Sequence, residues 1–155
     1  MNINIKKIQL IIYDFDGVMT DNKVFVFEDG KEAVLCNRSD GLAVKKIKEC
    51  GVRQIIVSTE TNPVVRKRAE KLGIEVIQGV DKKEKIVREF CLNNDYDLKN
   101  VIFIGNDVND IEAMKLVGIP VAPSDAYCDV LQVAKIVMKT PGGGGVIREL
   151  FELLA

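Results

Sequence analysis

Residues 8–17 read I-Q-L-I-I-Y-D-F-D-G, so that an apolar run at 8–13 ends directly in the carboxylates of Asp14 and Asp16. A continuous apolar run of this length is typical of a strand covered on both faces, as in a parallel sheet. Two carboxylates this close repel each other unless a cation lies between them, and Mg²⁺ accepts carboxylates together with phosphate oxygens. The stretch therefore predicts a buried strand with a Mg²⁺ site at its carboxyl end, although a polar turn carrying two acids is the alternative.

Strand-like and helix-like segments alternate along the rest of the chain. Further strands are expected at 54–57, 75–77, 101–104, 120–122 and 136–138, and helices at 40–50, 63–72, 82–93, 107–117, 126–133 and 146–154. This alternation predicts an α/β fold with a Rossmann-like, mostly parallel sheet and helices on both faces. In the first helix we expect Leu42, Val44 and Ile47 to face the core. Residues 1–155 are expected to form a single domain.

A β-hairpin is expected to extend from this sheet. Residues 24–27 and 32–36 flank Asp29-Gly30, a dipeptide typical of the tight turn between two strands. The first strand reads V-F-V-F, and such an apolar exposed edge tends to associate with other chains. The hairpin is therefore predicted to lie in interfaces between subunits.

Composition excludes several classes of function. Lys and Arg total 22, Asp and Glu total 23, and the net charge of −1 gives no reason to expect nucleic acid or a membrane surface as partner. No run of 18 apolar residues predicts a membrane span, and the N-terminal segment lacks the cleavage site of a signal peptide. Histidine is absent, which excludes histidine nucleophiles and bases and ordinary zinc sites. The four cysteines are scattered and are expected to be reduced, mostly buried thiols of a cytoplasmic protein.

Polar residues follow the apolar runs, where ligands bind in open α/β sheets. Ser58 ends the run I-I-V-S, and residues 106–110 follow the strand predicted at 101–104. Lys83 comes shortly after Gln78-Gly79, at the start of a predicted helix. Lys82, Lys83 and Lys85 are alternatively solvated charges of that helix, and the spacing from Gln78-Gly79 favours Lys83 over Lys82 as a site residue.

Taken in order, these residues resemble the four motifs of the haloacid dehalogenase-like hydrolase superfamily, in its phosphatase branch. D-F-D-G-V-M-T-D at 14–21 is similar to the first motif, Ser58 to the second, Lys83 to the third, and G-N-D-V-N-D at 105–110 to the fourth. The resemblance covers nearly the whole chain. It implies a phosphoric monoester hydrolase that depends on Mg²⁺.

The resemblance also implies a role for each matching residue. Asp14 would attack phosphorus and form an aspartyl-phosphate, and Asp16 would serve as general acid and then as general base. Ser58 and Lys83 would bind the phosphoryl oxygens, with Lys83 adding positive charge. The metal would be held by Asp14, Asp16 and the fourth motif.

The fourth motif departs from the family pattern, because Asn106 stands where the family usually has a metal-binding aspartate. An amide oxygen can still bind Mg²⁺, but it carries less negative charge. Asp107 could compensate directly, and Asp110 could act through water. A further alternative is that Asn106-Asp107 only caps the next helix. The sequence leaves open whether Asn106 or Asp107 contacts the metal.

No cap domain is expected, because residues 21–40 are too few to form one. The chain thus resembles the capless sugar-acid phosphatases, whose members include phosphatases of 3-deoxy-manno-octulosonate 8-phosphate. This resemblance implies a homotetramer built on the hairpins, in which a neighbour's C-terminal segment helps to cover the site. Residues 142–145 are four glycines followed by V-I-R-E and resemble the glycine-rich tail of that family. A flexible turn before a C-terminal helix is the alternative.

Two residues narrow the expected substrate. Glu60 stands where octulosonate phosphatases typically have arginine. In this position the chain resembles the branch of the family that acts on nonulosonate 9-phosphates. Lys71 falls where that branch carries a substrate-facing lysine, and related domains occur with acylneuraminate cytidylyltransferases. We therefore expect a Mg²⁺-dependent phosphatase of a nonulosonate 9-phosphate. The alternatives are an octulosonate 8-phosphate phosphatase and a catalytically weak scaffold domain associated with a cytidylyltransferase.

Overall fold

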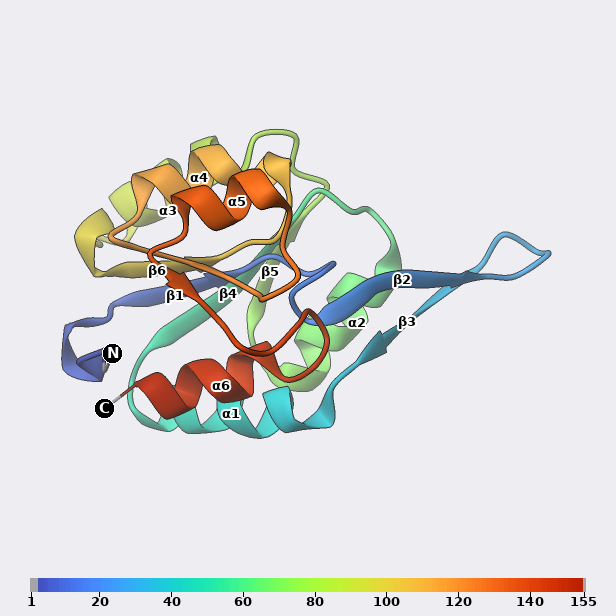
Figure 1. Ribbon diagram of the computed structural model, residues 1–155, viewed down its shortest axis with the longest axis horizontal. Coiled ribbons are helices and arrows are strands. Elements are labelled where there is room, and N and C mark those ends of the chain that lie inside the picture. The colour runs from blue at the N-terminus through green and yellow to red at the C-terminus, as the bar shows by residue number, and fades with distance from the viewer. Residues whose placement is uncertain (1–2, 155) are drawn as a thin grey trace.

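The computed structural model describes residues 3–154, and its centre is a six-stranded sheet (Figure 1). The strand order is β5-β4-β1-β6-β7-β8, and every neighbouring pair is parallel. The strands are β1 (Leu10–Tyr13), β4 (Arg53–Ser58), β5 (Glu75–Gln78), β6 (Val101–Ile104), β7 (Ile119–Ala122) and β8 (Ile136–Val137). All four residues of β1 are fully buried, as its apolar run predicts. The Rossmann-like α/β prediction is confirmed.

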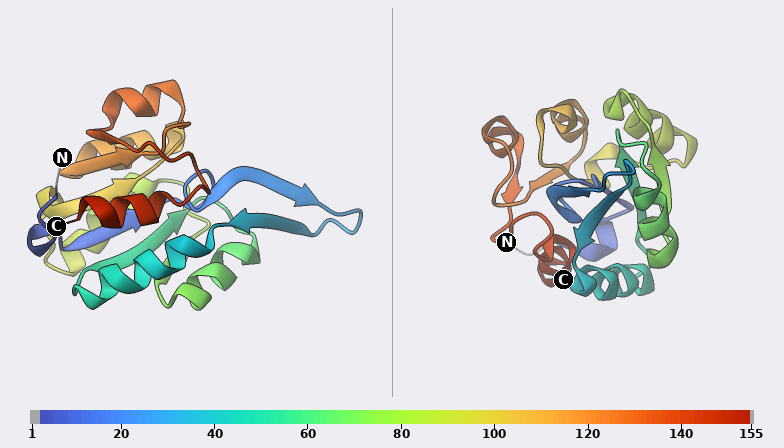
Figure 2. Two further views of the ribbon diagram at one scale, coloured as in Figure 1. Left: turned by 60° about the horizontal axis from the view of Figure 1, so that its bottom comes forward. Right: turned by 90° about the vertical axis from the view of Figure 1, so that its right-hand side faces the viewer.

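Helices cover both faces of the sheet (Figures 1 and 2). One layer contains α1 (Arg38–Glu49), α2 (Pro63–Leu72) and α6 (Val146–Leu153), and the other contains α3 (Lys83–Asn93), α4 (Ile111–Leu116) and α5 (Cys128–Val133). Each layer has its own apolar core, and β1 contributes to both: Ile11 and Tyr13 face the first core, and Leu10 and Ile12 face the second. This alternation follows from the two-residue period of a strand.

Two details of the helices differ from the sequence-based expectation. In α1 the buried apolar residues are Ala43, Val44 and Ile47, whereas Leu42 is 63% exposed. Leu42 precedes Ala43 by about 100° around the helix axis, which turns its side chain out of the buried stripe. The helix expected at 107–117 is divided into a 3₁₀ turn, Val108–Asp110, followed by α4. The physical reason lies in the side chain of Asp110, described below.

The hairpin forms as predicted and projects from the body of the fold (Figures 1 and 2). It consists of β2 (Thr20–Val26) and β3 (Glu32–Cys36), which pair antiparallel as a separate two-stranded sheet. Its outer part exposes Phe25, Val26, Phe27 and Leu35, each more than half accessible. The hairpin occupies the place in the chain where a cap domain would be inserted, and it is too small to be one.

The cysteines are less buried than expected. Cys91 is buried and Cys36 half-buried, but Cys50 and Cys128 are exposed; all four are free thiols. Within residues 3–154, no helix combines the length and the apolar character that crossing a bilayer requires.

Candidate active site

The carboxyl ends of β1, β4 and β6 meet at one edge of the sheet. Tyr13 is in register with Ile56 of β4 and with Ile104 of β6, so the residues that follow these strands emerge at the same level. The strand order reverses between β1 and β6, which is where open α/β sheets form a ligand crevice. A cavity of about 340 Å³ lies there and is lined mainly by polar residues: Asp14, Asp16, Asn22, Ser58, Thr59, Asn106, Asp107, Val108 and Asn109.

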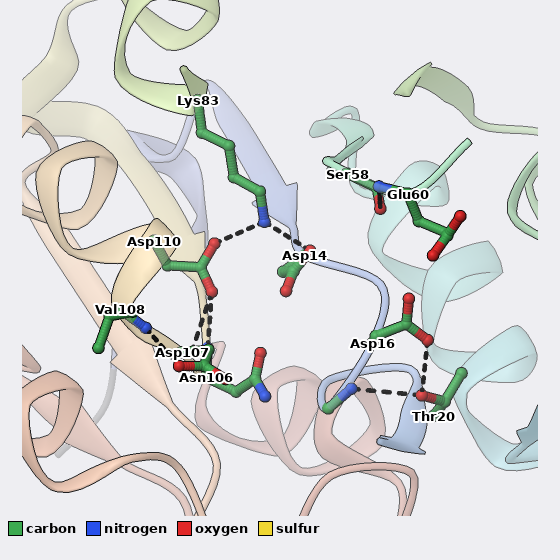
Figure 3. A network of polar contacts seen from close by, with 11 residues as sticks. Asp14, Asp16, Thr20, Ser58, Glu60, Lys83, Asn106, Asp107, Val108 and Asp110 are labelled. Carbon is green, nitrogen blue, oxygen red and sulfur yellow. Dashed lines mark hydrogen bonds and ion pairs between the residues drawn. The ribbon is translucent and has the colours of Figure 1, made fainter. Parts of the chain in front are cut away.

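Lys83 reaches into this edge of the sheet from the first turn of α3. It is 1% exposed, and its Nζ lies 2.6 Å from Asp14 Oδ1 and 2.7 Å from Asp110 Oδ1 (Figure 3). The neighbouring Lys82 is exposed. The structure thus brings Lys83, and not Lys82, to Asp14, in agreement with the spacing from Gln78-Gly79.

The three buried charges perturb one another. Burial, followed by the charge of Asp110, raises the pKa of Asp14 to about 7, although the ammonium of Lys83 opposes this rise. Burial disfavours the charged form of Lys83, but the two carboxylates together outweigh burial and leave the pKa of Lys83 raised. Both ion pairs are short, and the two carboxylate acceptors stabilise the charged ammonium of Lys83. When Asp14 is ionised, the two carboxylates outnumber the single ammonium, and the three side chains together carry a net negative charge.

From its place in the sequence Asp110 could act on the metal through water, but in the structure it pairs with Lys83 and with the backbone. It is fully buried, and besides pairing with Lys83 it accepts hydrogen bonds from the backbone N–H groups of Asn106 at 2.9 Å and Asp107 at 3.3 Å. Gly105 leaves room for it, since a Cβ there would lie 2.5 Å from Asp110 Cβ. These bonds form the 3₁₀ turn ahead of α4. The signal in the sequence is the four-residue spacing of Asn106 and Asp110, which a tight turn brings back together.

Asn106 lies between the first motif and the Asp110 turn. One amide position of its side chain is 2.8 Å from the carbonyl oxygen of Asp16 and 3.1 Å from Asp14 Oδ2. If the amide nitrogen occupies this position, it donates two hydrogen bonds. If the amide oxygen occupies this position, as drawn in Figure 3, it meets the Asp16 carbonyl oxygen and Asp14 Oδ2 with no proton between the three oxygens. A cation stabilises such an arrangement.

These oxygen donors fit a hard cation such as Mg²⁺. Within the part of the chain that the structure describes, no group of three His, Cys, Asp or Glu side chains is placed to hold a metal. The candidate set therefore depends on the amide of Asn106 and the main-chain carbonyl of Asp16 in addition to Asp14. Asp107 lines the cavity, but its Oδ1 accepts the N–H of Val108 at 2.7 Å and caps the 3₁₀ turn. The geometry thus directs Asn106, rather than Asp107, toward Asp14.

Asp16 and Ser58 lie on the cavity wall as the strand-end argument predicts. Burial raises the pKa of Asp16, and a hydrogen bond from Thr20 Oγ1 to Asp16 Oδ1, 3.2 Å long, opposes the rise. Ser58 is 2% exposed, and its Oγ accepts the N–H of Glu60 at 3.1 Å. Because that N–H occupies an acceptor position, the hydroxyl proton of Ser58 remains available for a phosphoryl oxygen.

Glu60 and Lys71 do not lie together. Glu60 follows Ser58, and its Oε1 accepts the N–H groups of Thr61 and Asn62 at 2.7 and 2.9 Å. Its carboxylate lies on the same side of the site as Asp16, and its charge contributes to raising the pKa of Asp16 (Figure 3). Lys71 instead lines a separate hollow of about 800 Å³ between α1 and α2, with residues that include Arg38, Lys45, Lys48 and Arg68.

Within the single chain Lys71 therefore does not line the cavity beside Glu60, and its contact with the sugar stays a prediction. Lys71 is the ninth residue of α2, which begins with Pro63, so it lies about 12 Å further along the helix axis. Of the four glycines at 142–145, Gly142 and Gly143 contact the first motif of their own chain, where Gly143 N donates to Val18 O at 3.1 Å. Their contribution to a neighbouring subunit's site stays a prediction.

Comparison with known proteins shows the family to which the chain belongs. Residues 42–150 match the profile of a haloacid dehalogenase-like hydrolase. The 3-deoxy-D-manno-octulosonate 8-phosphate phosphatase of Yersinia pestis is 30% identical over 148 residues, which cover 95% of this chain and 79% of that protein. N-acylneuraminate cytidylyltransferase A of Danio rerio is 28% identical over 149 residues, which cover 94% of this chain. The chain spans only 34% of the length of that cytidylyltransferase.

Solved structures show the same fold. A protein of Streptomyces avermitilis MA-4680 assigned to the HAD family superposes with a TM-score of 0.97 at 38% identity, over 99% of this chain and 88% of that one. The 3-deoxy-D-manno-octulosonate 8-phosphate phosphatase of Moraxella catarrhalis, solved with magnesium, phosphate and KDO, gives a TM-score of 0.92 at 27% identity, over 96% of this chain and 86% of that one. Because these matches extend over nearly all of a chain that carries a hairpin in place of a cap, the protein belongs to the haloacid dehalogenase-like hydrolases, within their capless sugar-acid phosphatase branch.

Proposed function

We propose that this phosphatase releases phosphate from a nonulosonate 9-phosphate through an aspartyl-phosphate on Asp14. The observation that carries the proposal is the buried setting of Asp14, where Lys83 holds Oδ1 and the amide of Asn106 lies beside Oδ2. Such a carboxylate is fixed in direction while it still borders the polar cavity. A fixed carboxylate beside a cavity that has room for a phosphoryl group is arranged for attack on phosphorus.

The reaction has two steps. In the first, a carboxylate oxygen of Asp14 bonds to phosphorus, the bond from phosphorus to the ester oxygen breaks, and Asp16 gives its proton to the departing oxygen. In the second, water attacks the phosphorus, Asp16 takes a proton from this water, and the carboxylate of Asp14 is released with inorganic phosphate. The raised pKa of Asp16 supports this double role, because it brings the protonated form closer to neutral pH.

Lys83 and Ser58 are proposed to bind the transferred group. The ammonium of Lys83 would stabilise negative charge on the phosphoryl oxygens, and the hydroxyl of Ser58 would donate a hydrogen bond. Mg²⁺, held by Asp14, the Asp16 carbonyl and Asn106, would supply further positive charge when bound. The oxygens that converge between Asp14, Asp16 and Asn106 and the magnesium of the Moraxella catarrhalis structure support this choice of metal.

The choice of sugar acid depends on Glu60. Its carboxylate lies on the same side of the site as Asp16, where it could accept hydrogen bonds from hydroxyl groups of the leaving sugar. A nine-carbon sugar acid also agrees with the similarity to an N-acylneuraminate cytidylyltransferase. The second candidate substrate is 3-deoxy-manno-octulosonate 8-phosphate. The similarity of this chain to the phosphatases of Yersinia pestis and Moraxella catarrhalis that are named for this compound supports it. A scaffold without activity is disfavoured, because the charged groups of the site are buried together at a cost in desolvation.

Assembly and location are part of the proposal. A homotetramer that buries the hairpin would cover its exposed apolar side chains, including Phe25 and Val26. The four free cysteines are compatible with a cytoplasmic location. We treat residues 1–155 as a single phosphatase domain, organised around one central sheet.

The test is Mg²⁺-dependent phosphate release from nonulosonate 9-phosphate, octulosonate 8-phosphate and an aryl phosphate, with Asp14→Asn as the blank. Activity on all three that disappears in Asp14→Asn, with the nine-carbon substrate preferred, supports the proposal. A preference for the eight-carbon substrate would replace the sugar while keeping the mechanism. Turnover by Asp14→Asn at a rate near that of the wild type would contradict the mechanism.

A further inference from the structure

The C-terminal glycine segment, residues 142–145, lies against the turn that follows Asp16 in the same chain. Gly142 N donates to Asp125 Oδ1 at 2.8 Å, and Gly143 N donates to Val18 O at 3.1 Å. Neither glycine has room for a side chain: a Cβ on Gly142 would overlap the carbonyl oxygen of Gly17, and one on Gly143 would lie 2.5 Å from the backbone nitrogen of Asp21. The two backbones are therefore in direct contact.

The other side of this turn carries functional groups. Thr20 is fully buried, and its Oγ1 accepts the N–H groups of Gly17 and Asn22 and donates to Asp16 Oδ1, each at 3.2 Å. Gly17 also adjoins Asn106, whose amide a Cβ on Gly17 would overlap. The turn at 17–21 is thus enclosed between the glycine segment and the side chains of Asp16 and Asn106.

The glycine segment is itself held in place. Glu149, in the first turn of α6, accepts the N–H groups of Lys139 and Thr140 at 3.0 and 2.8 Å. Asp40, a buried residue of α1, accepts the N–H of Arg148 at 3.0 Å and so ties the start of α6 to α1. With both ends of the segment anchored, a displacement at Gly142 is transmitted to the turn rather than absorbed by the segment.

We infer that Gly142 and Gly143 are positioning residues for the phosphatase reaction: they set the place of the turn at 17–21, and through Thr20 they orient Asp16. The inference rests on the proposed role of Asp16 as general acid and base. Glycine is then required at 142 and 143 for catalysis, because a side chain there would displace the turn and with it Asp16. A small misplacement of a proton-transfer group lowers the rate by a large factor.

Gly142→Ala tests the inference. Gly142 does not have a positive φ, so alanine can take its backbone conformation, and the added methyl group acts by pushing on the backbone of Gly17 and Thr20 in the turn at 17–21. We expect kcat to fall by about tenfold or more. The matched control is Gly41→Ala in α1, where the new Cβ would meet Leu72 Cδ2 at an ordinary 3.4 Å and kcat should not change.

A double-mutant cycle separates positioning from a merely structural role. Thr20→Val alone should lower kcat, because it removes the hydrogen bond to Asp16. In the Thr20→Val background, Gly142→Ala should lower kcat further by less than about twofold, since the route to Asp16 is already broken. An equal loss in both backgrounds would overturn the inference, as would a lower melting temperature with unchanged kcat.

Asp125→Ala provides a milder variant should Gly142→Ala fail to fold, because Asp125 is exposed and only its bond to Gly142 N is lost. It should lower kcat less than Gly142→Ala, and this loss should also vanish in the Thr20→Val background; a loss that persists there would overturn the inference. Asp14→Asn separates a failure of the proposed phosphatase mechanism from a failure of the positioning inference. If it keeps turnover, the proposed function fails. If it is inactive while Gly142→Ala and Asp125→Ala behave like Gly41→Ala, only the positioning inference fails.

Discussion

Lys83 Nζ lies 2.6 Å from Asp14 Oδ1, and both side chains are buried. The same ammonium is 2.7 Å from Asp110 Oδ1, so one cation is shared by two carboxylates. Burial and the charge of Asp110 raise the pKa of Asp14 to about 7, which means that near neutral pH its carboxylate is held in balance between a proton and a positive partner. When Asp14 is ionised, its carboxylate and that of Asp110 outnumber the ammonium of Lys83, and this net negative charge favours a metal cation beside Asp14.

The pH dependence of metal activation follows from this pKa. Mg²⁺ needs the ionised carboxylate, and Asp14 without metal takes up a proton as the pH falls through about 7. The Mg²⁺ concentration that gives half-maximal activity should therefore rise as the pH is lowered from 8 to 6, approaching about tenfold per pH unit below 7. Titrations of activity with Mg²⁺ at several pH values measure it. A half-maximal Mg²⁺ concentration that does not change between pH 8 and 6 would show that no proton on Asp14 competes with the metal.

Asn106→Asp should bind Mg²⁺ more tightly than the wild type. The substitution places a charged oxygen where one amide position lies 3.1 Å from Asp14 Oδ2, and added ligand charge should lower the half-maximal Mg²⁺ concentration by about tenfold. Asp107→Asn is the control: an asparagine can still cap Val108 N, so the Mg²⁺ requirement should stay within about twofold. The reverse pattern, with only Asp107→Asn changing the requirement, would make Asp107 the ligand.

The centre of the sheet is predictable from the sequence because β1, β4 and β6 are buried on both faces and read as apolar runs, of which 8–13 is the clearest. Helix boundaries are less predictable where a side chain competes for backbone N–H groups. Asp110 takes those of Asn106 and Asp107 and replaces the first turn of the helix expected at 107–117 with a 3₁₀ turn. Leu42 is apolar yet exposed, because its neighbours Ala43 and Val44 define the buried stripe.

The candidate site is predictable to the extent that it consists of strand ends. Asp14, Ser58 and Asn106 lie together because parallel strands place their carboxyl ends at one edge. The position of Lys71 depends on the direction of a whole helix, which local spacing does not reveal. The contact of Gly142 with the first motif depends on packing between distant parts of the chain, and a run of glycines is compatible with several conformations.

Substrate preference should change with Glu60. Glu60→Arg should lower the ratio of kcat/KM for nonulosonate 9-phosphate to kcat/KM for octulosonate 8-phosphate by about tenfold or more. The proposed hydrogen bond from a sugar hydroxyl to the carboxylate is lost, and the guanidinium that replaces it can only donate hydrogen bonds. Activity on an aryl phosphate, which lacks the sugar, should change little. An unaltered ratio would remove Glu60 from substrate selection and leave the phosphatase assignment intact.

The hairpin should control assembly. Phe25 on β2 is 68% exposed, so a homotetramer should bury it, and Phe25→Glu should yield smaller species in light scattering at micromolar concentration. Leu92→Glu on α3 is the matched control, because Leu92 is 78% exposed but lies away from the hairpin, and this variant should remain tetrameric. A wild-type protein that scatters as a monomer would contradict the proposed assembly.

The covalent role of Asp14 is tested most directly by rapid mixing of Asp16→Asn with an aryl phosphate and Mg²⁺. A good leaving group departs without a proton from residue 16, whereas hydrolysis of the aspartyl-phosphate lacks its general base. We predict a burst of about one aryl alcohol per active site, followed by slow turnover, with phosphate found on Asp14 in the peptide map. Release without a burst, and no phosphate on Asp14 in the quenched protein, would contradict the account.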